Sequence, residues 1–209
     1  MGLGLTIVGG GITWASATLK DDDGYYTSKT LHIDKDSYAV VTKPADIHLG
    51  SAWGWDLGDL VRFKVEGSNN DPLKNIFIGV APESNITDYL QDVEYDEIVG
   101  FHIHPDELVY QHHSGNLTPV APTNETFWTH SVNGSGNQTL YWELETGRWV
   151  FAVMNADGSQ DVNVSVRVGA EIPWLFPLGL SFLIVGIVGL VAGPVMIGLA
   201  VRRPRGPTS

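Results

Sequence analysis

The clearest pattern of hydrophobic and polar positions lies in residues 147–168, where an apolar run is followed by an alternating one. Residues 149–154, WVFAVM, are apolar throughout, which is typical of a strand covered on both faces. Turn-forming residues follow, with Gly158 suited to a positive φ. From Val162 to Val168, valine alternates with polar residues, as in a strand with one solvent-exposed face. The pattern predicts a β-hairpin at the end of a sandwich.

Short segments rich in β-branched and aromatic residues recur along the chain and are predicted to be strands. They are 25–33, 37–43, 60–66, 75–81, 97–103, 107–113, 127–132, 139–144, 148–154 and 161–168. The one helical candidate is 84–93, with Ser84 as N-cap and Asp88 in the first turn. Many short strands at turn-rich spacing predict a mainly β domain, an antiparallel β-sandwich of jelly-roll-like or Ig-like type.

A long uncharged segment follows the last predicted strand. Residues 174–201 carry no charge and, as a helix, would span about 42 Å, more than the roughly 30 Å hydrocarbon core of a bilayer. The sequence RRPR comes next, and basic flanks stay in the cytoplasm. We therefore predict a transmembrane helix at 173–201 and a cytoplasmic basic tail at 202–209. Gly189 and Gly193 have the GxxxG spacing that allows close approach of another helix.

The first 19 residues are apolar and rich in glycine, and two interpretations remain open. Residues 1–19 are either a first transmembrane helix or a signal peptide with the cleavage site ASA at 15–17. No positive residue precedes Lys20, which favours the helix. Both interpretations place an extracytoplasmic domain at 20–172, anchored in the lipid bilayer of the cell membrane.

Charge and cysteine content exclude several functions. Residues 20–172 hold nine Lys and Arg against 24 Asp and Glu, a net charge of −15, which argues against nucleic acid as a partner. There is no cysteine, so disulfides, a thiolate nucleophile and cysteine-ligated zinc are excluded. No GxSxG, P-loop or Rossmann glycine motif is present, and we predict neither a catalytic residue nor a cofactor.

Glycosylation sequons give the strongest chemical signal in the chain. The motif N-x-[ST] occurs six times, which indicates a surface exposed to a glycosylating host. The six candidate sites are Asn85, Asn116, Asn124, Asn133, Asn137 and Asn163. The alternative is that these residue types simply occur together in polar turns.

Four histidines form a candidate metal site. His102 and His104 share one face of a predicted strand, and His112 and His113 follow on the next strand. This spacing suits zinc or copper. The alternative is a set of ordinary surface histidines on an acidic module.

Two tryptophans form a candidate stacking platform for a sugar ring. Trp53 and Trp55 are separated by a single glycine, and flat aromatic faces suit such a ligand. The alternative is that both rings cover the edge of the sandwich.

Several segments resemble a family of uncharacterised prokaryotic membrane proteins found chiefly in actinobacteria and archaea. They are ATLKDDDGYYTS, IFIGVAPESNITDYLQDVEYDEI and LYWELETGRWVFAVMNADGSQDVNVSVRVG, together with the basic tail, and GRWVFAVMNADGS is the most specific part. The resemblance implies a β-rich extracytoplasmic domain between two membrane helices, and it implies no activity. The chain departs from the family in its short first helix and its many sequons.

These observations predict a membrane-anchored cell-surface module that acts through protein contacts, without catalysis. Such a module would be an accessory subunit of a membrane or envelope assembly, joined to a protein partner or to itself through the glycine-bearing helices. The alternative function is an extracytoplasmic sensor that binds a carbohydrate or a metal.

Overall fold

The computed structural model describes Asp21, residues 23–47, 61–103, 106–171, Pro177 and 180–185, with only the backbone at 101–103, 106 and 107. The chain divides into two units. One is Tyr25–Glu171, and the other combines Met1–Gly24 with Ile172–Ser209. The first unit contains every strand described below.

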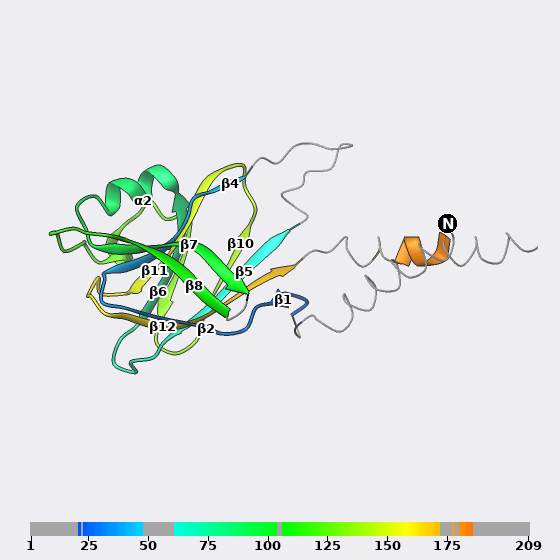
Figure 1. Cartoon of the computed structure of the whole chain (residues 1–209), viewed down its shortest axis with the longest axis horizontal. Helices are drawn as coiled ribbons and strands as arrows, with labels where there is room; N and C mark the ends of the chain where they lie inside the picture. The colour runs from blue at the N-terminus through cyan, green and yellow to red at the C-terminus, as the bar shows by residue number, and fades with distance from the viewer. Residues whose placement is uncertain are drawn as a thin grey trace, which may run out of the picture. The chain divides into compact units, whose positions relative to one another are not determined.

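A five-stranded sheet forms one layer of this unit (Figure 1). Its order is β1-β12-β5-β10, and β2 also pairs with β12. The strands are β1 (Tyr26–Thr27), β2 (Leu31–Lys35), β5 (Arg62–Asn69), β10 (Gln138–Glu143) and β12 (Val162–Glu171).

A seven-stranded sheet forms the next layer. Its order is β8-β7-β3-β11-β6-β9, and β4 also pairs with β11. The strands are β3 (Ala39–Thr42), β4 (Ala45–Ile47), β6 (Ile76–Pro82), β7 (Tyr95–Ile103), β8 (Asp106–His113), β9 (His130–Gly134) and β11 (Gly147–Asn155). Among the described ladders only β3–β7 is parallel, which corrects the purely antiparallel prediction. The long connection from β3 to β7 passes through α2 (Glu83–Tyr89) and allows the two strands to run in the same direction.

The two sheets face each other across a shared hydrophobic core. Val65 and Val164 enter it from the five-stranded sheet, and Ile78 and Val153 enter it from the seven-stranded sheet. Burial of this apolar area is the main favourable contribution to folding. The mainly β prediction is therefore confirmed.

A second hydrophobic cluster covers the other face of the seven-stranded sheet. Phe77 and Met154 of the sheet pack there with Ile86 of α2 and with Trp128, which follows η2 (Pro122–Asn124). The ring centroids of Phe77 and Trp128 are 4.9 Å apart. The seven-stranded sheet is thus a middle layer, and β11 is buried on both faces as its apolar run predicts.

The predicted hairpin at 147–168 is wrong, because β11 and β12 belong to different sheets. The chain crosses between the sheets at 156–161, where Gly158 has the predicted positive φ, 75°. Asn155 holds this crossing in place. Its side chain is fully buried, and Nδ2 donates to the carbonyls of Ser159, Gln160 and Asp161 at 3.0, 2.8 and 3.2 Å.

Local boundaries differ from the predictions in several places. The helix ends at Tyr89, and its N-cap position is Pro82 without a side-chain cap. Ser84 is not the N-cap, and its Oγ donates to Oδ1 of Asn85. The acid in the first turn is Glu83. Strand β4 was not predicted, and the predicted strand 25–33 overlaps two short strands.

Residues 1–19, 202–209 and most of 173–201 lie outside the described residues, so the predicted membrane segments remain predictions. Residues 180–185 are helical. Within the described part of the chain, no helix is long and apolar enough to cross a membrane.

The crossing turn gives a pH-dependent contribution to stability. Oδ1 of Asp157 accepts a hydrogen bond from the backbone N–H of Ser159 at 3.0 Å, and this bond lowers the pKa of Asp157 below 3.8. The stabilisation is fully present above pH 3.8 and is lost as the pH falls through the lower, folded-state value. The free energy of unfolding, measured with urea, should fall between neutral pH and about pH 3. We expect this fall to be larger for the wild-type chain than for Asp157→Asn. The exposed Asp88→Asn is the charge-matched control, and equal losses in wild type and Asp157→Asn would contradict the prediction.

Candidate ligand-binding site

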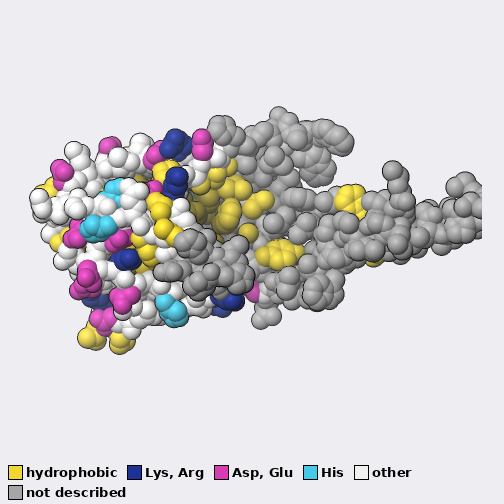
Figure 2. Space-filling model, viewed as in Figure 1, with side chains coloured by type: hydrophobic (Ala, Val, Ile, Leu, Met, Phe, Trp, Pro, Cys, Tyr) yellow, Lys and Arg dark blue, Asp and Glu magenta, His cyan; other side chains and the backbone are white. Residues whose placement is uncertain are grey.

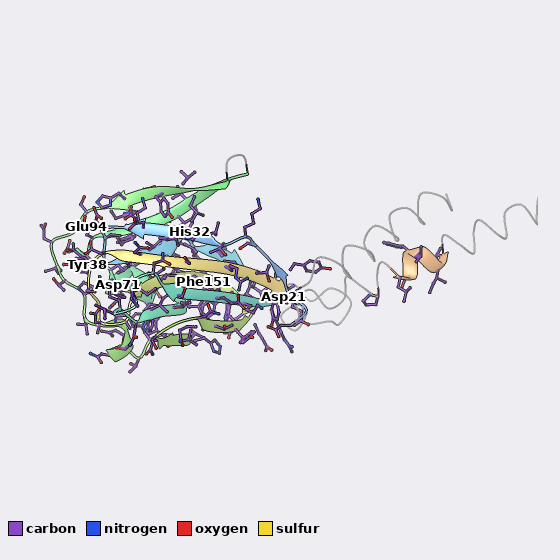
Figure 3. The ribbon with its side chains drawn as sticks, turned by 90° about the horizontal axis from the view of Figure 1, so that it is seen from below. Asp21, His32, Tyr38, Asp71, Glu94 and Phe151 are labelled. Carbon is purple, nitrogen blue, oxygen red and sulfur yellow. The ribbon has the colours of Figure 1, made fainter. Side chains whose placement is uncertain are left out.

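A seam between the two sheets is the main candidate site. Strand β2 lies at the edge of the five-stranded sheet, and β8 lies at the edge of the seven-stranded sheet. Lys35 of β2 reaches over the ring of Tyr110 of β8, with Nζ 3.9 Å from the ring centroid. Figure 3 labels one residue from each part of the seam. His32 of β2 lines the outer part, and Phe151 lines the inner part.

The outer part of the seam is an open groove of about 880 Å³. Its described lining combines hydrophobic side chains, such as Leu108 and Tyr110, with polar ones, such as Ser28 and Thr30. Over β2 and β8, Figure 2 shows basic, histidine and hydrophobic side chains next to one another. The volume lies within the range of about 300–1,000 Å³ that is common for small-molecule sites.

The inner part of the seam is an apolar cavity of about 160 Å³ between the sheets. Eleven of its twelve described lining residues are hydrophobic, and Thr42 is the exception. Oγ1 of Thr42 already accepts a hydrogen bond from the backbone N–H of Phe151 at 3.1 Å. An apolar cavity of this kind holds no water and suits a hydrocarbon group.

Three residues connect the two spaces. Leu31, Leu108 and Val168 line both the groove and the cavity. Val168 is 38% exposed, although the alternating pattern predicts a buried residue there. The groove and the cavity therefore adjoin at these three side chains.

The groove carries more positive than negative groups, in contrast to the acidic unit around it. Its described charged lining residues are Lys29, Lys35 and one carboxylate, Asp34, and they lie beside the imidazole of His32. Burial, with the negative charge of Asp96, raises the pKa of Tyr110 to about 12. The Tyr110 ring is therefore neutral at physiological pH, and its contact with Lys35 is a cation–π interaction that keeps the ammonium charge at the mouth.

A short hydrogen-bond chain orients His32. Oγ of Ser165 donates to Oδ1 of Asn70 at 2.8 Å and lies 3.0 Å from Nδ1 of His32. Because the hydroxyl proton is used on Asn70, Nδ1 of His32 is the donor in the second contact, and Nε2 is then the acceptor of the neutral ring.

The predicted metal-binding histidines that the structure describes lie at two places. His102 is opposite Glu107 on the β7–β8 ladder, whereas His112 is opposite Asp96, six positions away along β7. At about 3.3 Å per residue these backbone positions are about 20 Å apart, too far for one metal ion. His104 and the side chain of His102 lie outside the described residues.

His112 and His113 contact carboxylates instead of each other. Nε2 and Nδ1 of His112 lie 3.4 Å from Glu94 and 3.5 Å from Asp96. Nε2 of His113 lies 3.2 Å from Glu97, and its ring stacks on Tyr95 with centroids 4.4 Å apart. No three His, Asp or Glu side chains within the described ranges are placed to hold a metal ion.

The six sequons differ in exposure. Asn116, Asn124, Asn133 and Asn137 are exposed, while Asn85 and Asn163 are half-buried. Oδ1 of Asn163 also accepts a hydrogen bond from Asn70 at 2.6 Å. Glycosylation of these residues stays a prediction, with the four exposed asparagines the most accessible.

The predicted stacking residues, Trp53 and Trp55, lie outside the described residues. The seam was not predicted from the sequence. Its two sides come from β2 and β8, and Lys35 and Tyr110 are 75 residues apart in the chain, so no local motif contains both.

The comparisons with known proteins add no family to this geometry. No protein-family model matches the chain, and no curated protein matches it.

Proposed function

We propose that the protein is a membrane-anchored, extracytoplasmic binding module that takes a ligand into the seam between β2 and β8. The observation that carries this proposal is the apolar cavity between the sheets, which adjoins an open groove at their edges. An empty apolar cavity lowers stability, so a ligand that fills it stabilises the folded unit. The proposal takes up the ligand-binding alternative from the sequence, with a different site from the predicted histidines and tryptophans.

The proposed setting is the cell surface, with a β-sandwich held between two transmembrane helices. Support comes from the two uncharged segments of the sequence and from the face-to-face sheets. The pairing of Tyr26 with Ala170 also supports it, because both ends of the β unit lie side by side. Two flanking helices would therefore leave the unit from neighbouring points.

The protein-contact function remains a second candidate, in which the module is an accessory subunit of an envelope assembly. It is favoured by three large hydrophobic side chains on loops: Leu73 is 93% exposed, Leu117 56% and Val120 57%. Exposed apolar side chains on loops are available to pack against a protein partner.

Native mass spectrometry of the full chain, extracted in mild detergent from its own membranes, tests the proposed function. We expect a small-molecule adduct on the wild type that is absent from Val168→Trp. Val168 lines both the groove and the cavity and is partly exposed, so an indole there blocks the seam without overfilling the buried core. Tyr141→Trp, at an exposed position that lines neither space, is the control and should retain the adduct.

The outcomes separate the two functions. An adduct that depends on Val168 supports the binding module. A chain without any small-molecule adduct, or with the same adduct in Val168→Trp, contradicts the seam as the binding site. A stoichiometric partner chain in place of an adduct supports the accessory-subunit function.

A further inference from the structure

The chemistry of the inner cavity selects the part of the ligand that enters it. Its described walls present hydrophobic side chains from both sheets, and the only hydroxyl among them, that of Thr42, already accepts a backbone hydrogen bond. A sugar ring or other polar group would lose its hydrogen bonds to water there without replacement, which is unfavourable. The part of the ligand that enters is therefore a hydrocarbon.

The sizes of the two spaces determine the shape of the ligand. The cavity, at about 160 Å³, is smaller than a typical small-molecule site, whereas the groove, at about 880 Å³, is not. A slender tail fits the cavity, and the bulk of the ligand lies in the groove. The two spaces adjoin at Leu31, Leu108 and Val168, where the tail would enter the cavity.

The charges at the mouth select the head of the ligand. Among the described lining residues, the groove brings together two of the nine Lys and Arg of residues 20–172, Lys29 and Lys35, with one carboxylate, Asp34. The surrounding unit is strongly acidic and repels anions in general, so a local excess of positive groups is selective for an anion held at this point. Lys35 is well placed to receive it, because its ammonium group is held at the seam by the Tyr110 ring.

We propose that the seam binds a single-chain anionic amphiphile of the fatty-acid class, with the end of its tail in the inner cavity, the rest of its chain along the groove and its carboxylate at Lys35. This inference rests on the proposed function, because it names the ligand of the same site. Binding is noncovalent. The buried tail contributes the hydrophobic free energy, and the carboxylate contributes a charge-assisted hydrogen bond from Lys35.

Photo-crosslinking tests the ligand class in the full chain, reconstituted in nanodiscs of zwitterionic lipid. The probe is palmitic acid with a mid-chain diazirine and a terminal alkyne, and the labelled peptides are mapped by mass spectrometry. We expect labelling of peptides that contain β2, β8 or β12. Labelling of these peptides is normalised to labelling outside residues 25–171, which corrects for probe dissolved in the bilayer.

Four comparisons identify the tail and the head separately. Val168→Trp should abolish the labelling of the seam peptides. Lys35→Glu should raise the probe concentration needed for half-maximal labelling about tenfold or more, because it replaces an attractive charge with a repulsive one. Lys74→Glu is the control, because it makes the same charge change at a lysine that does not line the groove and that donates to the carbonyl of Gln160. It should leave the concentration for half-maximal labelling unchanged. The corresponding alcohol probe should label about tenfold more weakly than the acid.

Each outcome has a defined meaning. Equal labelling by the acid and the alcohol, or by wild type and Lys35→Glu, overturns the anionic head while the tail site stands. Absence of seam labelling overturns the fatty-acid class. If the Val168-dependent adduct from the native membranes is still observed, the proposed function survives this failure with another ligand. If that adduct is missing as well, the proposed function fails too.

Discussion

Asn155→Ala is expected to lower the free energy of unfolding by about 3–4 kcal/mol, the largest effect of any single substitution considered for this chain. The Asn155 side chain is fully buried and makes four hydrogen bonds. Nδ2 donates to three carbonyls of residues 159–161, and Oδ1 accepts from Nδ2 of Asn69 at 2.8 Å. Alanine leaves one half-buried donor, Nδ2 of Asn69, and several carbonyls without this partner, and each such group is costly.

Urea unfolding of the full chain, followed by tryptophan fluorescence, measures this effect. Asn70→Ala is the matched control, because Asn70 is also a hydrogen-bonded asparagine but is exposed, and we expect a loss below about 1 kcal/mol. A loss for Asn155→Ala as small as that of the control would show that the buried hydrogen bonds do not hold the crossing between the sheets.

Gly79→Ala is expected to destabilise the unit by about 2–3 kcal/mol through overpacking. A Cβ at Gly79 of β6 would lie 2.6 Å from Cε3 of Trp128 and 2.8 Å from Cε1 of Phe77. Trp128 has little freedom to move, because Nε1 donates to the carbonyl of Pro122 at 3.0 Å and its ring packs against Phe127. The added methyl group would therefore push the outer aromatic layer away from the middle sheet.

A double-mutant cycle identifies the cause. In a Trp128→Leu background the smaller side chain leaves room, so adding Gly79→Ala should cost less than about 1 kcal/mol further. Gly100→Ala is the control, because a Cβ there meets only Val109 at an ordinary 3.7 Å. Additive effects of Gly79→Ala and Trp128→Leu would contradict the steric explanation.

The strands were predictable wherever burial follows a simple period. The doubly covered strand at 149–154 and the alternation from Val162 to Val166 are both confirmed, because each reports which faces of a strand are buried. The same pattern does not show which sheet a strand joins. The apparent hairpin is a crossing between sheets. Its sequence resembles a polar turn that begins at Asn155, but the Asn155 side chain is buried and hydrogen-bonds to the backbone of the crossing.

The sequence predicts the seam less well than it predicts the strands. Histidines and tryptophans stand out in a sequence because they are chemically distinctive, whereas the seam is built largely from ordinary leucine, valine and lysine. Its existence depends on two edge strands from different sheets that face each other without pairing. That arrangement is a property of the tertiary fold, and no spacing within either strand encodes it.

The pairing of β1 with β12 also determines how the unit responds to mechanical load. Tyr26 and Ala170 are register partners in an antiparallel ladder, so the first and last strands enter and leave at the same end. A force that separates the two chain ends then acts across this ladder and opens its hydrogen bonds one after another, like a zipper. Because β1 has only two residues, it peels away first, while β12 keeps its long ladder with β5. Tension on the two ends is therefore absorbed by a short, reversible detachment before the hydrophobic core is exposed.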